Sequence, residues 1–360
     1  MKIPSGSVPF VLVLLTVSLS CSLLSPPAPP TVTPSPIPPM LEDYCIVFLS
    51  KNDGNWNLTR FDTVQGNDTN LLGNFNGVSP PSFSPDGGLL LFTANRDDVY
   101  NVFTFQPDSG DLFNVTDDQS VNHLPSWHPD GQRILYMTGD FGSNQIYVIH
   151  GDGSNRINLS NSSADDTSPQ WSPDGSRISF LSNRAAEKRN IYDIYLMGMD
   201  GSHVIRLTNF TRKFGMSIPK WSPDGNQLAY ISAAVNDNDI CTINVNTGET
   251  HCVANLKDTV SNLAWSPDGK HLAYSATFNS KGITSNIYVM NADGSESTNL
   301  TEGLGSCSEF DWSLDGGNIL FSCYVEDVYD SRFYSIKVDG TSLASIMEFS
   351  EIVHAPQWCE

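Results

Sequence analysis

The chain has 360 residues, of which 39% are hydrophobic and 10% aromatic, enough for a hydrophobic core, and this excludes wholesale disorder. It carries 19 Lys and Arg against 40 Asp and Glu, so its formal net charge is −21. A chain this acidic repels phosphate backbones, which excludes sequence-independent nucleic-acid binding as a main function. Its seven cysteines indicate an oxidising compartment.

The first twenty residues have the pattern of a secretory signal. Lys2 precedes an apolar run over Val8–Ser20, which is too short to span a bilayer. The run ends at Cys21, and this ending resembles the cleavage and acylation site of bacterial lipoproteins. We therefore expect residues 1–20 to be a signal peptide and Cys21 to carry a lipid. The alternative is an ordinary secretory signal followed by an incidental cysteine.

The next segment is rich in proline, which makes up eight of the fifteen residues from Ser25 to Pro39. Such a run favours polyproline II and acts as a semi-rigid spacer of about 3 Å per residue. We expect residues 21–42 to be a lipid-anchored tether for a folded domain over residues 43–360. The alternative is a disordered leader that only separates the domain from the membrane. Contact with a membrane is expected through the lipid anchor only.

From residue 43 onward the chain repeats one motif, an aromatic residue followed by Ser-Pro-Asp-Gly or a close variant. The aromatic residues lie 44 to 50 residues apart and are Phe83, Trp127, Trp171, Trp221, Trp265 and Trp312. Within the motif, Pro and Asp suit a type I turn and Gly suits the left-handed residue that follows. Short runs of β-branched and aromatic residues come after each motif. This period, with four short strands per repeat, is typical of a propeller blade.

The two ends of the chain complete the count of blades. Residues 46–62 look like a repeat that lacks its first strand, and residues 354–358 look like that missing strand. Together with six full repeats they predict an all-β fold, a seven-bladed β-propeller of four-stranded antiparallel blades. Pairing of the N- and C-terminal strands is expected to close the ring, which removes an exposed sheet edge.

These motifs resemble the TolB-like, WD-like propeller repeats of bacteria, over residues 43–358. The resemblance implies a fold more strongly than it implies a function. TolB itself has an α/β domain before a six-bladed propeller and is not lipidated, whereas here a proline-rich tether directly precedes seven repeats. We therefore expect a TolB-like lipoprotein other than TolB itself, and the partners of TolB are not carried over.

The repeat register predicts the pairing of six cysteines, because it places them opposite one another on neighbouring strands. The expected disulfides are Cys45–Cys359, Cys241–Cys252 and Cys307–Cys323. The first of them would replace the missing covalent turn of the blade that both termini share and would lock the ring. The alternative is buried thiols. Metal binding is disfavoured because the chain has no Cys-x-x-Cys.

Strand order places the Ser-Pro-Asp-Gly turns on one rim and the loops that vary between repeats on the other, here called the variable rim. Variable loops on a rigid scaffold are where propellers usually bind. The candidate ligand-binding residues there are Arg96, Asp97, His123, Asn183, Arg184 and His354. The two histidines share one repeat position and could hold a metal, or be structural or solvated. The two arginines could hold an anion, or only pair with carboxylates.

The sequence contains no Gly-x-Ser-x-Gly nucleophile elbow, phosphate-binding loop, dinucleotide fingerprint or His-Glu-x-x-His. We therefore expect no catalysis, no cofactor and no metal. We expect a monomeric, exported, membrane-anchored lipoprotein that faces the periplasm or the cell exterior. Its expected function is to bind an envelope or extracellular protein, peptide or glycan. The alternative is a metal-dependent polysaccharide lyase or hydrolase at the pore mouth.

Overall fold

The computed structural model describes residues 45–52, 55–62, 67–72, 75–140, 142–185, 191–210, 218–234, 237–256, 259–278, 284–325, 330–349 and 353–358. The expected signal peptide, the tether, Cys21 and Cys359 lie outside these residues. The regular elements of the described part are all β-strands, and it holds no helix with the length and hydropathy needed to cross a membrane.

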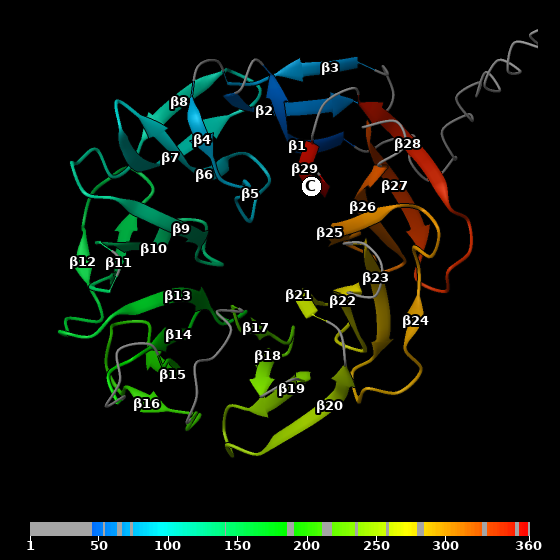
Figure 1. Ribbon diagram of the computed structural model, residues 1–360. Helices are drawn as coiled ribbons and strands as arrows, with labels where there is room; N and C mark the ends of the chain where they lie inside the picture. Colours follow the sequence, from blue (N-terminus) through cyan, green and yellow to red (C-terminus); the bar gives the residue numbers. More distant parts are fainter. Residues whose placement is uncertain are drawn as a thin grey trace, which may run out of the picture. The chain divides into compact units, whose positions relative to one another are not determined.

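The strands form seven antiparallel sheets, the blades of a propeller (Figure 1). Blade 1 has β29 (Val353–Trp358), β1 (Cys45–Asn52), β2 (Asn55–Asp62) and β3 (Asn67–Asn70). Blade 2 has β4 (Asn76–Val78), β5 (Ser82–Phe83), β6 (Leu90–Arg96), β7 (Val99–Gln106) and β8 (Asp111–Asn114). Because β4 and β5 both pair with β6, they act together as one innermost strand.

The remaining five blades each have four strands, running from the innermost to the outermost in chain order. Blade 3 has β9 (Asn122–Trp127), β10 (Arg133–Thr138), β11 (Gln145–His150) and β12 (Ile157–Asn158). Blade 4 has β13 (Asp166–Trp171), β14 (Arg177–Ser182), β15 (Asp193–Gly198) and β16 (Ile205–Arg206). Blade 5 has β17 (Lys220–Trp221), β18 (Gln227–Ala234), β19 (Asp237–Asn244) and β20 (Thr250–Leu256). Blade 6 has β21 (Thr259–Trp265), β22 (His271–Phe278), β23 (Thr284–Asn291) and β24 (Thr298–Asn299). Blade 7 has β25 (Ser306–Trp312), β26 (Asn318–Val325), β27 (Asp330–Lys337) and β28 (Ala344–Phe349).

The hydrophobic core lies between the blades, so the second strand of a blade is buried on both faces. Successive side chains of a strand point to opposite faces of its sheet. In β14, Ile178 and Phe180 pack with Leu135 of blade 3, whereas Leu181 packs with Leu228 of blade 5. This arrangement explains why the second strands are almost continuously apolar, and it makes each blade depend on its neighbours.

The predicted closure of the ring is confirmed. β29 pairs with β1 in antiparallel register, with Val353 opposite Ser50 and Gln357 opposite Val47. Val353 is 2% exposed and packs with Ile46, Phe48 and Phe333. The last strand of the chain therefore completes the first blade, as the repeat count predicts.

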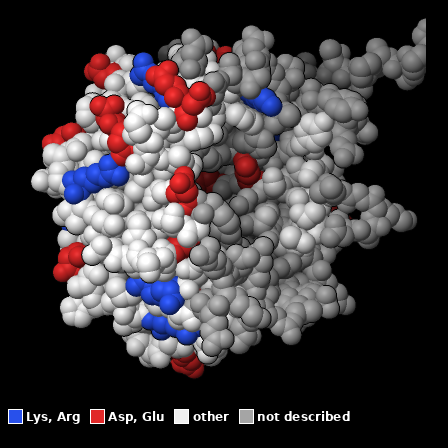
Figure 2. Space-filling view, turned by 60° about the vertical axis from the view of Figure 1, so that its left-hand side comes forward, with Lys and Arg blue, Asp and Glu red and all other residues white. Residues whose placement is uncertain are grey.

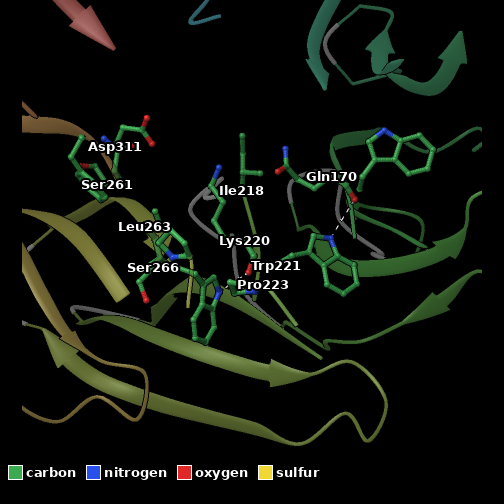
Figure 3. A pocket seen from close by; sticks show the side chains of 15 residues that line it. Gln170, Ile218, Lys220, Trp221, Pro223, Ser261, Leu263, Ser266 and Asp311 are labelled. Atoms are coloured by element: carbon green, nitrogen blue, oxygen red, sulfur yellow. Dashed lines mark hydrogen bonds between the residues drawn. The ribbon is translucent and has the colours of Figure 1, made fainter. Parts of the chain in front are cut away.

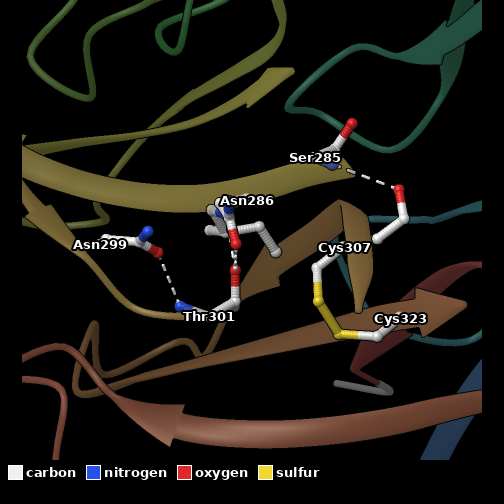
Figure 4. The surroundings of a disulfide bond; sticks show 8 residues. Ser285, Asn286, Asn299, Thr301, Cys307 and Cys323 are labelled. Carbon is white, nitrogen blue, oxygen red and sulfur yellow. Dashed lines mark hydrogen bonds between the residues drawn. A yellow bond between two sulfur atoms is a disulfide. The ribbon is translucent and has the colours of Figure 1, made fainter. Parts of the chain in front are cut away.

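Two of the three predicted disulfides are confirmed. Cys241 on β19 is bonded to Cys252 on β20, and Cys307 on β25 is bonded to Cys323 on β26 (Figure 4). Each pair occupies opposing positions of an antiparallel ladder, which is the arrangement predicted from the repeat register. The third predicted pair includes Cys359 and lies outside the described residues. The two bonds favour an oxidising compartment.

The Ser-Pro-Asp-Gly turns have the predicted conformation. The φ angles of their glycines lie between 69° and 72°, in the left-handed region. In blade 4, the Ser172 hydroxyl donates to Asp174 Oδ1 at 2.6 Å, and the N–H of Ser176 donates to the same oxygen. These hydrogen bonds lower the pKa of Asp174 to about 2. The motif is therefore a self-contained turn, which explains its near-identity in every repeat.

Substituting one of these glycines is expected to reveal a contact specific to blade 3. A Cβ at Gly175 would lie 2.2 Å from Nε2 of His128, the residue that replaces the serine in that repeat. At Gly225, with nearly the same φ, the nearest atom would be 3.7 Å away. We expect Gly225→Ala to lower the free energy of unfolding by about 1 to 2 kcal/mol through backbone strain.

We expect Gly175→Ala to lower the free energy of unfolding by about 1 to 3 kcal/mol more than Gly225→Ala does, because of the added steric clash. Adding His128→Ser to Gly175→Ala should recover this extra loss, as measured by chemical denaturation. Equal losses in the two single glycine variants would contradict the contact.

Candidate functional site

The candidate residues of the variable rim are spread over four neighbouring blades, blades 1 to 4. Arg96 ends β6, and Asp97 lies in the two-residue turn to β7, where both Asp97 and Asp98 have positive φ. This is the geometry of a tight hairpin turn. Arg96 and Asp97 are both exposed, and they belong to blade 2, whereas Asn183 and Arg184 belong to blade 4.

Asn183 and Arg184 both contact residues at or next to the start of β13. Asn183 Oδ1 accepts the backbone N–H of Asp165 at 3.0 Å. Arg184 forms a 2.9 Å ion pair with the buried Asp166, and its guanidinium lies over the ring of Tyr195. These contacts fasten the loop after β14 to the innermost strand of its own blade, which is a structural role.

The two histidines occupy equivalent positions, as the repeat alignment predicts. His123 on β9 pairs with Met137, and His354 on β29 pairs with Leu49 at the same place in the ladder. The ring centroid of His123 lies 5.3 Å from that of Tyr100, and burial lowers the pKa of His123. The side chain of His354 lies outside the described part. In that part, no three His, Cys, Asp or Glu side chains are grouped as a metal site requires.

A cleft of about 630 Å³ lies along the innermost strands of blades 4 to 7 (Figure 3). Its apolar wall includes Trp171, Trp221 and Trp265, the aromatic anchors of three repeats. The indole N–H of Trp265 donates to the carbonyl of Lys220 at 3.0 Å, so one inner strand is tied to the next. An aromatic wall with a few polar groups is the usual composition of a ligand site.

The polar groups of the cleft come from the same strands. They are Gln170, Lys220, Ser261, Asn262, Ser266 and Asp311. Figure 3 shows the side chains of Gln170, Lys220 and Asp311 directed to the same side of the cleft. Burial lowers the pKa of Lys220. Among the described residues, the cleft therefore offers one amine, one carboxylate and several amide and hydroxyl groups beside an aromatic wall.

The sequence interpretation missed this cleft because it looked for variation only in the loops. Gln170, Lys220 and Asp311 each stand directly before the aromatic residue of the motif. Across the repeats this position is occupied by Ser82, Ser126, Gln170, Lys220, Ala264, Asp311 and Gln357. A variable position next to a nearly invariant one was a signal of the site. Pro223, Ser266 and Pro267, on the rim of the Ser-Pro-Asp-Gly turns, also line the cleft.

The family model of the TolB beta propeller domain matches residues 44–186, 125–215 and 176–360. The chain belongs to the TolB β-propeller family. No curated protein matches the sequence. This match confirms the predicted resemblance to TolB-like propeller repeats.

Solved structures with the same fold include both TolB proteins and enzymes. TolB from Acinetobacter baumannii is 22% identical, with a TM-score of 0.54 over 71% of this chain and 63% of that one. An oligogalacturonate lyase in complex with manganese is 16% identical, with a TM-score of 0.64 over 78% of this chain and 82% of that one. Puromycin hydrolase is 15% identical, with a TM-score of 0.67 over 84% of this chain and 52% of that one. At these identities the likeness shows the fold alone, and the chain spans less than two thirds of the TolB and hydrolase structures.

Proposed function

We propose that this TolB-family propeller is an exported, lipid-anchored and monomeric binding protein for an envelope or extracellular protein, peptide or glycan. The observation that carries the proposal is the cleft of blades 4 to 7, with its tryptophan wall and convergent polar groups. The two disulfides support export. The net charge of −21 argues against nucleic acid as the ligand.

The predicted lipid anchor and tether would suit the same function. Cys21 and the proline-rich residues 21–42 would hold the propeller at a membrane. Presentation of this kind suits a protein that captures a partner in the periplasm or at the cell exterior. Figure 2 shows acidic side chains around the hollow on the visible face and basic ones mostly further out, which favours ligands that are not polyanionic.

Capture from an envelope extract tests the proposal, with two variants at the same repeat position. Gln170 lines the cleft, whereas Gln357 on β29 does not. Gln170→Trp should fill part of the cleft and reduce capture by about tenfold or more, equivalent to about 1.4 kcal/mol of binding free energy. Gln357→Trp should capture as the wild type does. Capture no higher than background, or equal capture by both variants, would count against the proposal.

A metal-dependent lyase or hydrolase at the pore mouth is the alternative. It is suggested by the shared fold of the oligogalacturonate lyase that was solved with manganese. Metal analysis of the same preparation separates the two functions. Stoichiometric metal that copurifies with the protein and is needed for cleavage of a polysaccharide would favour the enzyme.

A further inference from the structure

The side chain of Lys220 places an amine inside the cleft of blades 4 to 7. It extends from β17 into the cleft, with Gln170 to one side and Asp311 to the other (Figure 3). Within the described residues, no hydrogen bond or ion pair involves the Lys220 Nζ atom. Desolvation disfavours the charged amine and lowers its pKa. Lys220 is half-buried, so an oppositely charged partner in the cleft would stabilise its charged amine.

Five other basic side chains of the described residues have a carboxylate partner. The ion pairs are Arg133–Asp130, Arg156–Asp118, Arg184–Asp166, Arg206–Asp193 and Lys270–Asp268. Carboxylates outnumber basic groups by 40 to 19 in this chain. A partner for Lys220 would therefore have been easy to supply from the protein itself. Its amine is directed instead into a space that a ligand can enter.

We propose that Lys220 binds a carboxylate group of the ligand that occupies the cleft. The inference rests on the proposed function and specifies the chemistry of its ligand. A carboxylate would supply the opposite charge that the amine lacks, through a charge-assisted hydrogen bond. The side-chain amides of Gln170 and Asn262 line the same cleft and can donate to further ligand oxygens.

The position of Asp311 favours one orientation of the ligand in the cleft. Asp311 lines the other part of the cleft, on β25 of blade 7, and its carboxylate repels a second one. A ligand carboxylate is therefore favoured at Lys220 and disfavoured at Asp311. Trp221 and Trp265 line the same cleft and can contact the apolar part of the ligand.

Titration calorimetry with small probes tests the inference. The acidic probes are N-acetylglycine, which carries a peptide-type carboxylate, and glucuronate, which carries a sugar carboxylate. N-acetylglycinamide and glucose are their uncharged counterparts. We expect at least one acidic probe to bind the full-length protein about 10 to 100 times more tightly than its counterpart. The arm that shows this preference identifies the source of the carboxylate.

Three variants assign that preference to Lys220. Lys220→Met should abolish it, and Lys220→Arg should retain part of it. Lys270→Met removes the same charge from an exposed site outside the cleft and should leave the preference unchanged. Thermal denaturation of each variant checks that it is folded.

Two outcomes would overturn the inference: acidic and neutral probes that bind equally, or a preference that survives in Lys220→Met. Either would leave the proposed function intact if extract capture still depends on Gln170. If nothing is captured from the extract but acidic probes still bind better through Lys220, only the proposed class of macromolecular ligand is rejected.

Discussion

Replacing Val353 by aspartate is expected to lower the free energy of unfolding by about 4 kcal/mol or more. Val353 is 2% exposed and lies on the strand that closes the ring. Its side chain packs with Ile46 and Phe48 of the first blade and with Phe333 of the last. A carboxylate at this position would be buried without a partner and would weaken the pairing of β29 with β1. Urea denaturation of the two proteins measures the difference.

Ile157→Asp is the matched control for this prediction. Ile157 also lies on a strand, but on the outermost strand of blade 3, and it is 55% exposed. The same chemical change there should alter the free energy of unfolding by about 0.5 kcal/mol or less. If both variants unfold at the same urea concentration as the wild type, β29 does not hold the ring closed.

Removing the disulfide of blade 7 is expected to have the next largest effect. Cys307 and Cys323 are 16 residues apart in sequence, and both are buried. A bond that closes a loop of this size is expected to stabilise the fold by about 3 kcal/mol, mainly by restricting the unfolded chain. The double substitution Cys307→Ala with Cys323→Ala should lower the free energy of unfolding by about this amount.

Reduction provides the control for the disulfide prediction. Dithiothreitol should destabilise the wild type by more than it destabilises the double variant, because one of the bonds it cleaves is already absent there. The bond between Cys241 and Cys252, which are 11 residues apart, and the predicted Cys45–Cys359 bond should account for what remains. A double variant as stable as the oxidised wild type would show that the bond contributes nothing to the fold.

The fold could be predicted from the sequence because every blade carries the same short turn motif, which is stabilised by residues within the motif. Each Ser-Pro-Asp-Gly turn is held by its own serine and aspartate, as Ser172 and Asp174 show, so it marks the same place in every blade. Once that register is known, opposing cysteines and the closing strand follow from counting residues. The pairing of Cys307 with Cys323 depends only on this ladder.

The site could not be predicted in the same way because it depends on contacts between different strands. Arg184 was a reasonable anion-binding candidate, but Asp166, from a different strand of its own blade, is close enough to pair with it. Lys220 could not be recognised as a binding residue from the sequence. A lysine before a tryptophan indicates no site until the fold brings four inner strands together around one cleft. Variation beside the nearly invariant aromatic anchor was the available signal.

The most direct test of ligand binding in the cleft uses the tryptophan indole N–H signals in a ¹H–¹⁵N spectrum. The ligand captured from the envelope extract is added to the labelled protein. Signals of Trp171, Trp221 and Trp265, which line the cleft, should shift, whereas those of Trp127 and Trp312, which do not, should stay in place. Shifts confined to Trp127 and Trp312, or no shift in any of the five, would contradict binding in this cleft.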